Sequence, residues 1–529
     1  MFKKMTALLM AGTMLLGLSA CASKPTDTDD QGVTAYVGTA IFEEGLDPLK
    51  GAMHYGYPFI NNALIRVDPD SHYVGDLAET WEISDDGLHY TFHLRPGVSF
   101  SDGSAFTAED VVFTYEQVKE HPENNPEVDL SRLAKVEAVD NMTVEFQLSQ
   151  RYSPFFDTVA TLQIVPSDAY NAETFATNPI GTGAWKVAQY DANQQIILEP
   201  NESCYYGVPK LPPVTLVYMD GDAAFAAAKS GQLDVVMVGT AYVDETIDGM
   251  SLQRFETMDV RNISLPVQPR HTVTKEDGSE IVVGSDVTSD KAVRQALAIG
   301  IDRQEIIDHA LNGVGVPAVQ FTENLPWASR ESYTDGRADE AKELLEKAGW
   351  VDADGDGIRE KDGVRCAFDV YAAEDQDRYQ LAAALGESAR ALGIEITAKN
   401  ASWDEVMQVQ YSQGVVWGWG QHSPTVLPSL FDSSLFMEGD FDNVVDYENA
   451  KVDEMIQTAY AAGSPEEAVA DWQAVQDEAN ADFPYLYLVN IQHCYFVKDG
   501  LNLSPETQIP HPHGHGIPVI CNMNDWDWA

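Results

Sequence analysis

Short strand-like runs alternate with helical runs along the chain, and this alternation restricts its fold more than any other feature. Residues 88–94, LHYTFHL, alternate bulky and smaller polar side chains at the period of a strand. Residues 107–118, TAEDVVFTYEQV, begin with Thr107 as a helix cap and then place Val111 and Tyr115 at helical spacing. Because the alternation continues without internal repeats, the sequence predicts a mixed α/β architecture.

A second long segment predicts an amphipathic helix. Residues 290–311 carry apolar side chains on one face from Val293 to Ile306, with an interruption at Gly300. Two more helices are expected at residues 338–350, where Gly349 ends the helix, and 464–483, followed by a strand at 485–491.

The N-terminus has the layout of an export signal. Two lysines precede an uncharged stretch that ends at Cys21, and its apolar core is shorter than the roughly 20 residues that span a bilayer. Residues 18–21, LSAC, resemble a bacterial lipobox, in which the cysteine becomes lipidated. We therefore expect a signal peptide over residues 1–21, a flexible tether over residues 22–32, and an extracytoplasmic protein anchored to the cell membrane by lipid on Cys21. An ordinary secretory peptide with an incidental cysteine is the alternative.

Length and charge restrict the class of protein further. The 529 residues exceed what one hydrophobic core usually organises, so two or three domains are expected. The formal net charge of −52 repels nucleic acid phosphates, which excludes nucleic acid as a partner. We expect a monomer. The cysteines beyond the lipobox show no zinc pattern and are either free thiols or joined in one of three pairings. They are Cys204, Cys366, Cys494 and Cys521.

Five segments, in order along the chain, carry a resemblance to a known family. The longest is LAETWEISDDGLHYTFHLRPGVSFSDGSAFTAEDVVFTYE at Leu77–Glu116. The others are LDP at Leu46–Pro48, PIGTGAWKV at Pro179–Val187, VRQALAIGIDRQEII at Val293–Ile307 and AKELLEKAGW at Ala341–Trp350. In these segments the chain resembles extracellular solute-binding protein family 5, which includes oligopeptide-, dipeptide- and nickel-binding lipoproteins of ABC importers.

The resemblance implies an α/β fold of the periplasmic-binding-protein-like type, a two-lobed clamshell of class II, or cluster C, with an extra inserted domain. Domain I is expected at residues 33–62, 180–268 and 492–529, domain II at 63–179 and domain III, the distal lobe, at 269–491. The lobes enclose the ligand, and binding shifts an open–closed equilibrium that ABC permease subunits and their ATPase read. The implied function is delivery of a short peptide or similar small solute to the permease.

The resemblance also points to a ligand-reading segment, WGWGQHSPTVLPSLF, at residues 417–431. In peptide-binding members an aspartate of this segment pairs with the α-ammonium group of the ligand, and His422 stands at that position here. Nickel-binding members often take a histidine from the same segment, so His422 is either a metal ligand or a hydrogen-bonded histidine in a turn. Trp417 and Trp419, two apart on an expected strand, point the same way and form either a ligand-binding wall or part of the core.

Two other segments contain metal-ligating residues. The histidines of PHPHGHG, at alternate positions, can bind nickel or zinc or remain solvated. The aspartates of DADGDGIREKDG are spaced like the start of a calcium loop, but glycine replaces the glutamate at position twelve, so an acidic turn is favoured over weak calcium binding. The residues are His511, His513, His515, Asp352, Asp354 and Asp356. No cofactor is required for the implied function.

No catalytic motif accompanies these features. The GxSxG, HExxH and P-loop patterns are absent from the sequence, and we therefore expect no enzymatic activity. An extracytoplasmic hydrolase built on scattered carboxylates and a sensor of peptide signals are the alternatives from other classes.

Overall fold

The structure is a computed structural model that describes residues 32–43, 45–51, 59–125, 128–275, 277–321, 325–373, 376–507 and 518–529. The predicted signal peptide, Cys21 and the tether up to residue 31 lie outside the described residues, and so do His511, His513 and His515. Within these ranges, no helix combines the length and the apolar character that crossing a membrane requires.

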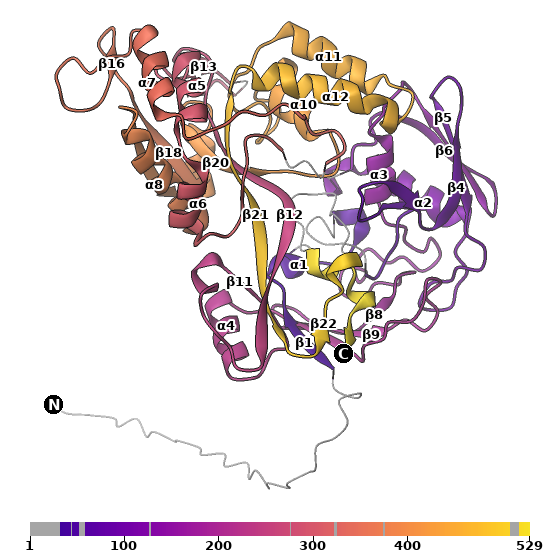
Figure 1. Cartoon of the computed structure of the whole chain (residues 1–529). Helices are drawn as coiled ribbons and strands as arrows, with labels where there is room; N and C mark the ends of the chain where they lie inside the picture. The colour runs from indigo at the N-terminus through magenta and orange to yellow at the C-terminus, as the bar shows by residue number, and fades with distance from the viewer. Residues whose placement is uncertain are drawn as a thin grey trace, which may run out of the picture.

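An eleven-stranded mixed sheet runs through the molecule (Figure 1). Its strand order is β19-β18-β20-β12-β21-β11-β1-β10-β9-β8, and β15 pairs with β21 beside this path. The strands are β1 Val33–Tyr36, β8 Trp185–Asp191, β9 Gln195–Pro200, β10 Val214–Val217, β11 Val235–Val238, β12 Met250–Ser264, β15 Val316–Pro317, β18 Ala367–Ala373, β19 Glu395–Ala401, β20 Gly414–Trp419 and β21 Tyr485–Lys498.

Two long strands of this sheet, β12 and β21, join the two lobes. They pair antiparallel along their length, with a bulge in β12 between Glu256 and Val260. On one side of the bulge β21 pairs with β11 of the first lobe, and on the other side β12 pairs with β20 of the distal lobe. A bulge is where a strand bends most easily, so the lobes meet at the irregular point of two otherwise continuous strands.

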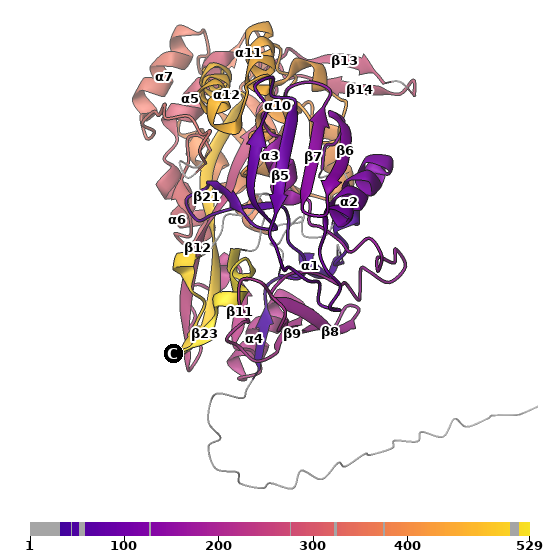
Figure 2. The ribbon, with the colours of Figure 1, turned by 90° about the vertical axis from the view of Figure 1, so that its right-hand side faces the viewer.

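The first lobe adds a four-stranded sheet of order β4-β5-β7-β6 (Figure 2). Its elements are β4 Ala78–Ile83, β5 His89–Leu94, α2 Ala108–Glu120, β6 Leu133–Asp140, β7 Thr143–Leu148 and α3 Phe155–Thr161. The strand and the helix predicted here are confirmed, and Thr107 caps α2 in a capping box with Asp110. Val111 and Tyr115 of α2 pack in the same core as Phe92 of β5.

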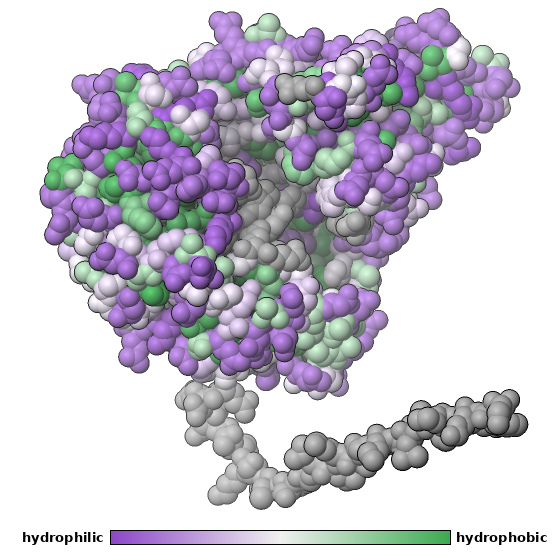
Figure 3. Space-filling model, turned by 180° about the vertical axis from the view of Figure 1, so that it is seen from behind, coloured by the Kyte–Doolittle hydropathy of each residue, from purple (hydrophilic) through white to green (hydrophobic). Residues whose placement is uncertain are grey.

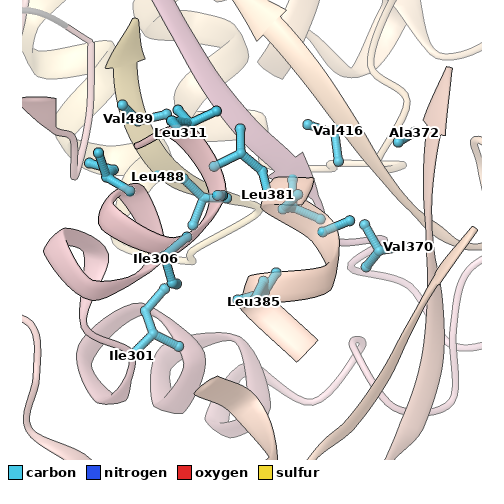
Figure 4. Close-up of a cluster of buried hydrophobic side chains, with 14 of the residues drawn as sticks. Ile301, Ile306, Leu311, Val370, Ala372, Leu381, Leu385, Val416, Leu488 and Val489 are labelled. Carbon is cyan, nitrogen blue, oxygen red and sulfur yellow. The ribbon is translucent and has the colours of Figure 1, made fainter. Parts of the chain in front are cut away.

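The distal lobe packs helices on both faces of the other end of the large sheet. They are α5 Lys291–Gly300, α6 Arg303–Leu311, α7 Ala338–Lys347, α8 Gln376–Arg390, α9 Trp403–Val409, α10 Val426–Phe431, α11 Ala450–Tyr460 and α12 Pro465–Asn480. Figure 4 shows part of one core, with Ile301, Ile306, Leu311, Val370, Ala372, Leu381, Leu385, Val416, Leu488 and Val489 labelled. A second core lies on the opposite face, since Val415 and Trp417 of β20 belong to it whereas Val416 belongs to the first.

Two predicted elements differ from the structure. Residues 290–311 form two helices instead of one, because the chain becomes extended at Ile301 and the Asp302 side chain caps α6 by accepting from the backbone N–H of Glu305. The strand predicted at residues 485–491 continues to Lys498, because its second half pairs with β11 in the first lobe.

The remaining elements are short. They are α1 Ala40–Glu43, α4 Gly221–Lys229 and the strand pairs β2 Ile65–Val67 with β3 Tyr73–Gly75, β13 His271–Thr274 with β14 Glu280–Val283, β16 Glu360–Lys361 with β17 Val364–Arg365, and β22 Leu501–Asn502 with β23 Asp527–Trp528. The surface seen from behind is mostly hydrophilic and is hollowed in its middle (Figure 3). The ranges given above for domains I, II and III stay predictions.

Candidate functional site

A cavity of about 720 Å³ lies between the two lobes. The first lobe contributes the turn between β2 and β3 and the beginning of α3. The distal lobe contributes a loop before α7, the segment after β20 and the first turns of α12. Prolines and aromatic rings form much of the wall, and carboxylates and an arginine supply polar groups. Among the lining residues are Ser71, Tyr73, Asp157, Trp327, His422 and Trp472.

His422, predicted as a site residue, lies in the wall of this cavity and connects the lobes. Its ring is buried, with Nδ1 2.9 Å from Oδ1 of Asp157 and Nε2 3.1 Å from the backbone oxygen of Ser71. The ring of Tyr73 packs edge-on against it at 5.1 Å between centroids. On the distal side, the indole Nε1 of Trp327 donates to the backbone oxygen of His422 at 2.7 Å. The histidine is therefore held in position by both lobes.

The two partners of the imidazole set its protonation state. A carboxylate and a backbone carbonyl both accept hydrogen bonds, so both ring nitrogens must donate, which only the imidazolium form can do. Burial, the largest single effect, lowers the pKa of His422, but the hydrogen bond and charge of Asp157, the Ser71 carbonyl and the Asp68 charge together outweigh it. The net result is a pKa raised above the ordinary histidine value.

The turn that presents Ser71 is built by Asp68. Oδ1 of Asp68 accepts hydrogen bonds from the backbone N–H groups of Asp70 and His72. The backbone oxygen of Asp68 accepts a hydrogen bond from the backbone N–H of Ser71. Ser71 adopts a φ of 65°, in the left-handed region that residues other than glycine rarely adopt. This local arrangement directs the Ser71 carbonyl out of the first lobe toward His422.

Other contacts join the lobes beside the cavity. The backbone N–H of Ser153 donates to the backbone oxygen of Tyr460 at 2.9 Å, and the Ser153 hydroxyl donates to the backbone oxygen of Ala459 at 2.8 Å. The guanidinium of Arg132 lies 4.3 Å from the ring centroid of Tyr152 and 5.0 Å from that of Tyr460. In Figures 1 and 2, α3 accordingly lies against the group formed by α10, α11 and α12. The structure thus shows the lobes in contact.

The two predicted tryptophans lie beside the cavity without lining it. Trp417 is 3% exposed in the distal core, where its Nε1 donates to the Ser264 hydroxyl at 3.1 Å and its ring stacks on Trp403. Trp419 is partly buried at 5.9 Å from Trp417, and its Nε1 has no hydrogen-bond partner among the described residues. The two rings are on the same side of β20, as their spacing predicts, and Trp417 belongs to the core.

The predicted acidic loop is held by its own backbone. Asp352 accepts from the N–H groups of Gly355 at 2.7 Å and Gly357 at 3.0 Å, and Arg365 donates to Asp356 at 2.6 Å. The ligand oxygens of Asp352, Asp354 and Asp356 come within 4.8 Å of one another at an exposed position. The loop has the hydrogen bonds of an acidic turn, and a bound calcium ion there stays a prediction.

Ser71 and Asp157 have functional contacts that sequence reasoning missed. They are 351 and 265 positions away from His422 in the chain, and neither lies in a motif. A serine that acts through its backbone oxygen leaves no signal in its residue type. For Asp157, the only available signal was an acidic residue in the first turn of a helix, which is common for structural reasons.

Both the sequence and the fold have relatives among known proteins. The profile described as "Bacterial extracellular solute-binding proteins, family 5 Middle" matches residues 72–435. The chain is 30% identical to Protein XP55 of Streptomyces lividans over 94% of this chain and 93% of that protein. It is 25% identical to the oligopeptide-binding protein AppA of Bacillus subtilis over 92% and 94%, respectively. It is 29% identical to the nickel-binding periplasmic protein of Escherichia coli over 58% and 59%.

Solved structures share the fold. NikA from Brucella suis in complex with Fe(III)-EDTA has a TM-score of 0.78 at 19% identity, covering 94% of this chain and 100% of NikA. AppA from Bacillus subtilis in complex with a nonapeptide has a TM-score of 0.68 at 22% identity, covering 95% and 100%. These likenesses confirm a two-lobed α/β fold of the periplasmic-binding-protein type.

Proposed function

Since the chain belongs to the bacterial extracellular solute-binding proteins of family 5, we propose that it is the substrate-binding lipoprotein of an ABC importer and carries short peptides. It captures its ligand between the lobes outside the cytoplasm and presents it, chemically unchanged, to the permease. The observation that carries this proposal is the cavity of about 720 Å³ between the lobes, walled by side chains of both. Cavities of about 300 to 1,000 Å³ suit organic ligands of small-peptide size.

The chemistry of the wall favours an organic ligand over a metal ion. Proline and aromatic surfaces bind apolar and amphipathic groups, whereas nickel and zinc need free imidazole or thiolate ligands. Both nitrogens of His422 are hydrogen-bonded within the protein, so the histidine does not fit a metal site in this arrangement of the lobes. The nickel alternative therefore needs ligands other than His422, and the predicted ligands His511, His513 and His515 lie outside the described residues.

The sequence relatives lean toward the same choice. The match to the oligopeptide-binding protein AppA spans 92% of the chain and the match to the nickel-binding protein spans 58%, whereas the structures of NikA and AppA cover 94% and 95% of the chain and do not separate the two ligands. The bulge in β12 gives the lobes a place to rotate, and a ligand that contacts both lobes shifts the equilibrium toward the closed state.

Native mass spectrometry of protein purified from its source, combined with elemental analysis of the same sample, tests the proposal. We expect a ladder of short peptides and no stoichiometric metal. Nickel at one equivalent would replace the peptide assignment with the nickel alternative. A ligand released with a cleaved bond would indicate a hydrolase.

A cavity-filling substitution tests whether this cavity is the ligand site. Val469 of α12 lines it, whereas the next residue, Ala470, is exposed and does not. We expect Val469→Trp to weaken binding of the co-purified peptide at least about tenfold, because lost cavity volume removes contact area. Ala470→Trp is the matched control and should bind like the unmodified protein in calorimetry. Equal affinity of both variants would place the ligand elsewhere.

A further inference from the structure

The interaction of His422 with the first lobe connects parts of the chain that must separate when the lobes open. His422 follows β20 in the distal lobe, while Asp157 lies in α3 and Ser71 in the β2–β3 turn of the first lobe. All three are nearly inaccessible to solvent in this closed arrangement. Opening the cavity breaks both hydrogen bonds and hydrates the ring.

The same geometry makes closure depend on a proton. A neutral imidazole has one N–H, so it can satisfy Asp157 or Ser71 but leaves its other nitrogen lone pair facing the second acceptor. Two acceptors that face each other without a proton between them destabilise the closed state, because water cannot reach them there. The charged ring satisfies both acceptors at once.

We propose that His422 is a proton-dependent latch between the lobes, which holds the cavity closed when the ring is protonated and releases it when the ring is neutral. The inference rests on the proposed function only in taking this cavity as the ligand site. It assigns His422 a role in ligand retention and release instead of direct ligand recognition.

The charged groups around the ring favour its protonated form. From the first lobe, Asp157 of α3 and Asp68 and Asp70 of the β2–β3 turn are acidic, His72 is a neighbouring titratable group, and Tyr73 packs its ring on the imidazole. From the distal lobe, Glu466 of α12 adds a carboxylate and Arg330 a cation at the cavity wall. The acidic groups outnumber the cation, and the nearest of them, Asp157, is in direct contact.

The direction of the pH effect follows from the two states. In the open state His422 is hydrated and has the ordinary pKa of about 6.5, and in the closed state its pKa is higher. The latch therefore stabilises the closed state fully below about pH 6.5. This stabilisation is lost as the pH rises through the pKa that His422 has in the closed state. Within that window the ratio of closed to open protein falls by up to about tenfold per pH unit.

The contacts that join the lobes beside the cavity add no competing titration in this range. Burial raises the pKa of Tyr152 well above its ordinary value, so its phenol stays neutral. The bonds of Ser153 to the backbone of α11 do not titrate. Closure should consequently weaken at alkaline pH without disappearing.

Single-molecule energy transfer measures this directly on ligand-free protein. Fluorophores are introduced through non-natural amino acids at Val139 of the first lobe and Val351 of the distal lobe, which are 60% and 46% exposed. Between pH 5.5 and 8.5 we expect the closed fraction of the unmodified protein to fall, and that of His422→Gln to be low and flat. A flat curve for the unmodified protein, or an unaltered one for His422→Gln, would overturn the proposal.

His89 provides a matched control. Its Nδ1 lies 3.2 Å from Glu145 Oε1, so it is also a histidine paired with a carboxylate, but both partners are in the four-stranded sheet of the first lobe. His89→Gln should retain the pH dependence of the unmodified protein. If His89→Gln removes it, the titrating group is not His422.

A second variant and a spectroscopic measurement keep the test independent of folding problems. Asp157→Asn removes the main acidic partner, and we expect the midpoint of the closure curve to move to lower pH. Nitrogen chemical shifts of the unmodified protein should show that His422 loses its second ring proton at a higher pH than an ordinary histidine, and a ring that titrates at or below about pH 6.5 would contradict the latch. A protein that carries no peptide but closes with this pH dependence would refute the proposed function alone. A peptide-binding protein with pH-independent closure would refute the latch alone.

Discussion

Two cationic side chains that lie in the interior, Arg303 and His422, are each surrounded by hydrogen-bond acceptors. Arg303, fully buried at the start of α6, donates to the backbone oxygens of Tyr487 at 2.8 Å and Ala298 at 2.9 Å. It also donates to Asp335 and to the Tyr333 hydroxyl. The guanidinium thereby links α6 to β21, one of the two strands that join the lobes. As at His422, protein acceptors replace water around the buried cation.

Replacing Arg303 should therefore destabilise the fold strongly. We expect Arg303→Met to lower the free energy of unfolding by about 3 kcal/mol, because buried carbonyl oxygens lose their donor and Asp335 loses its counter-charge. Arg390→Met is the control, since that arginine is 65% exposed and 3.9 Å from its carboxylate partner; it should change the free energy by less than about 0.5 kcal/mol. Urea denaturation followed by circular dichroism measures both, and similar effects of the two substitutions would contradict this account.

Elements with local signals were predictable from the sequence, and elements shaped by distant partners were not. The capping residue Thr107 and the terminating Gly349, which has a φ of 90°, mark helix ends within a few residues of sequence. The length of β21 depends on pairing with β11, about 260 positions away, and periodicity does not report that pairing. His422 was identified through a family resemblance, but its role depends on Ser71 and Asp157, which only the folded arrangement of the lobes brings to it.

The end of β20 depends on a glycine. Gly420 has a φ of 152°, and a Cβ there would lie 1.8 Å from the backbone oxygen of Met258. Because the obstacle is backbone of β12, Gly420→Ala must displace one of the two strands, and we expect a loss of stability of about 3 kcal/mol together with a lower closed fraction. Gly97→Ala has a positive φ of 78° but open space around it, so it should cost only about 1 kcal/mol. Thermal unfolding separates the two effects, and equal costs would show that the contact with Met258 is relaxed without penalty.

At the scale of the whole molecule, packing replaces covalent cross-links. The four described cysteines are buried, on strands or loops of both lobes, and no disulfide joins any two of them. Burial raises the pKa of Cys366 to about 12 and that of Cys494 to about 11, so both are uncharged thiols at neutral pH. The stability of each lobe therefore comes from its hydrophobic cores and from the shared sheet.

Reduction should accordingly leave the protein unchanged. We expect the melting temperature with dithiothreitol to agree within about 1 °C with that of the untreated protein, since no disulfide joins the four described cysteines. Iodoacetamide should modify the four thiols only in denaturant. Mass spectrometry can count the modified cysteines in each condition. A melting temperature that falls on reduction would reveal a disulfide.

The irregular stretch of β12 between Glu256 and Val260 has a mechanical consequence. The same two strands that let the lobes swing are paired on both sides of this stretch, so backbone hydrogen bonds hold them together in each lobe. The lobes then open by elastic bending of the paired strands β12 and β21, and no loop has to become ordered each time a ligand enters. Substitutions that stiffen or soften this stretch should change the residence time of the bound ligand, while the melting temperature of the protein hardly changes.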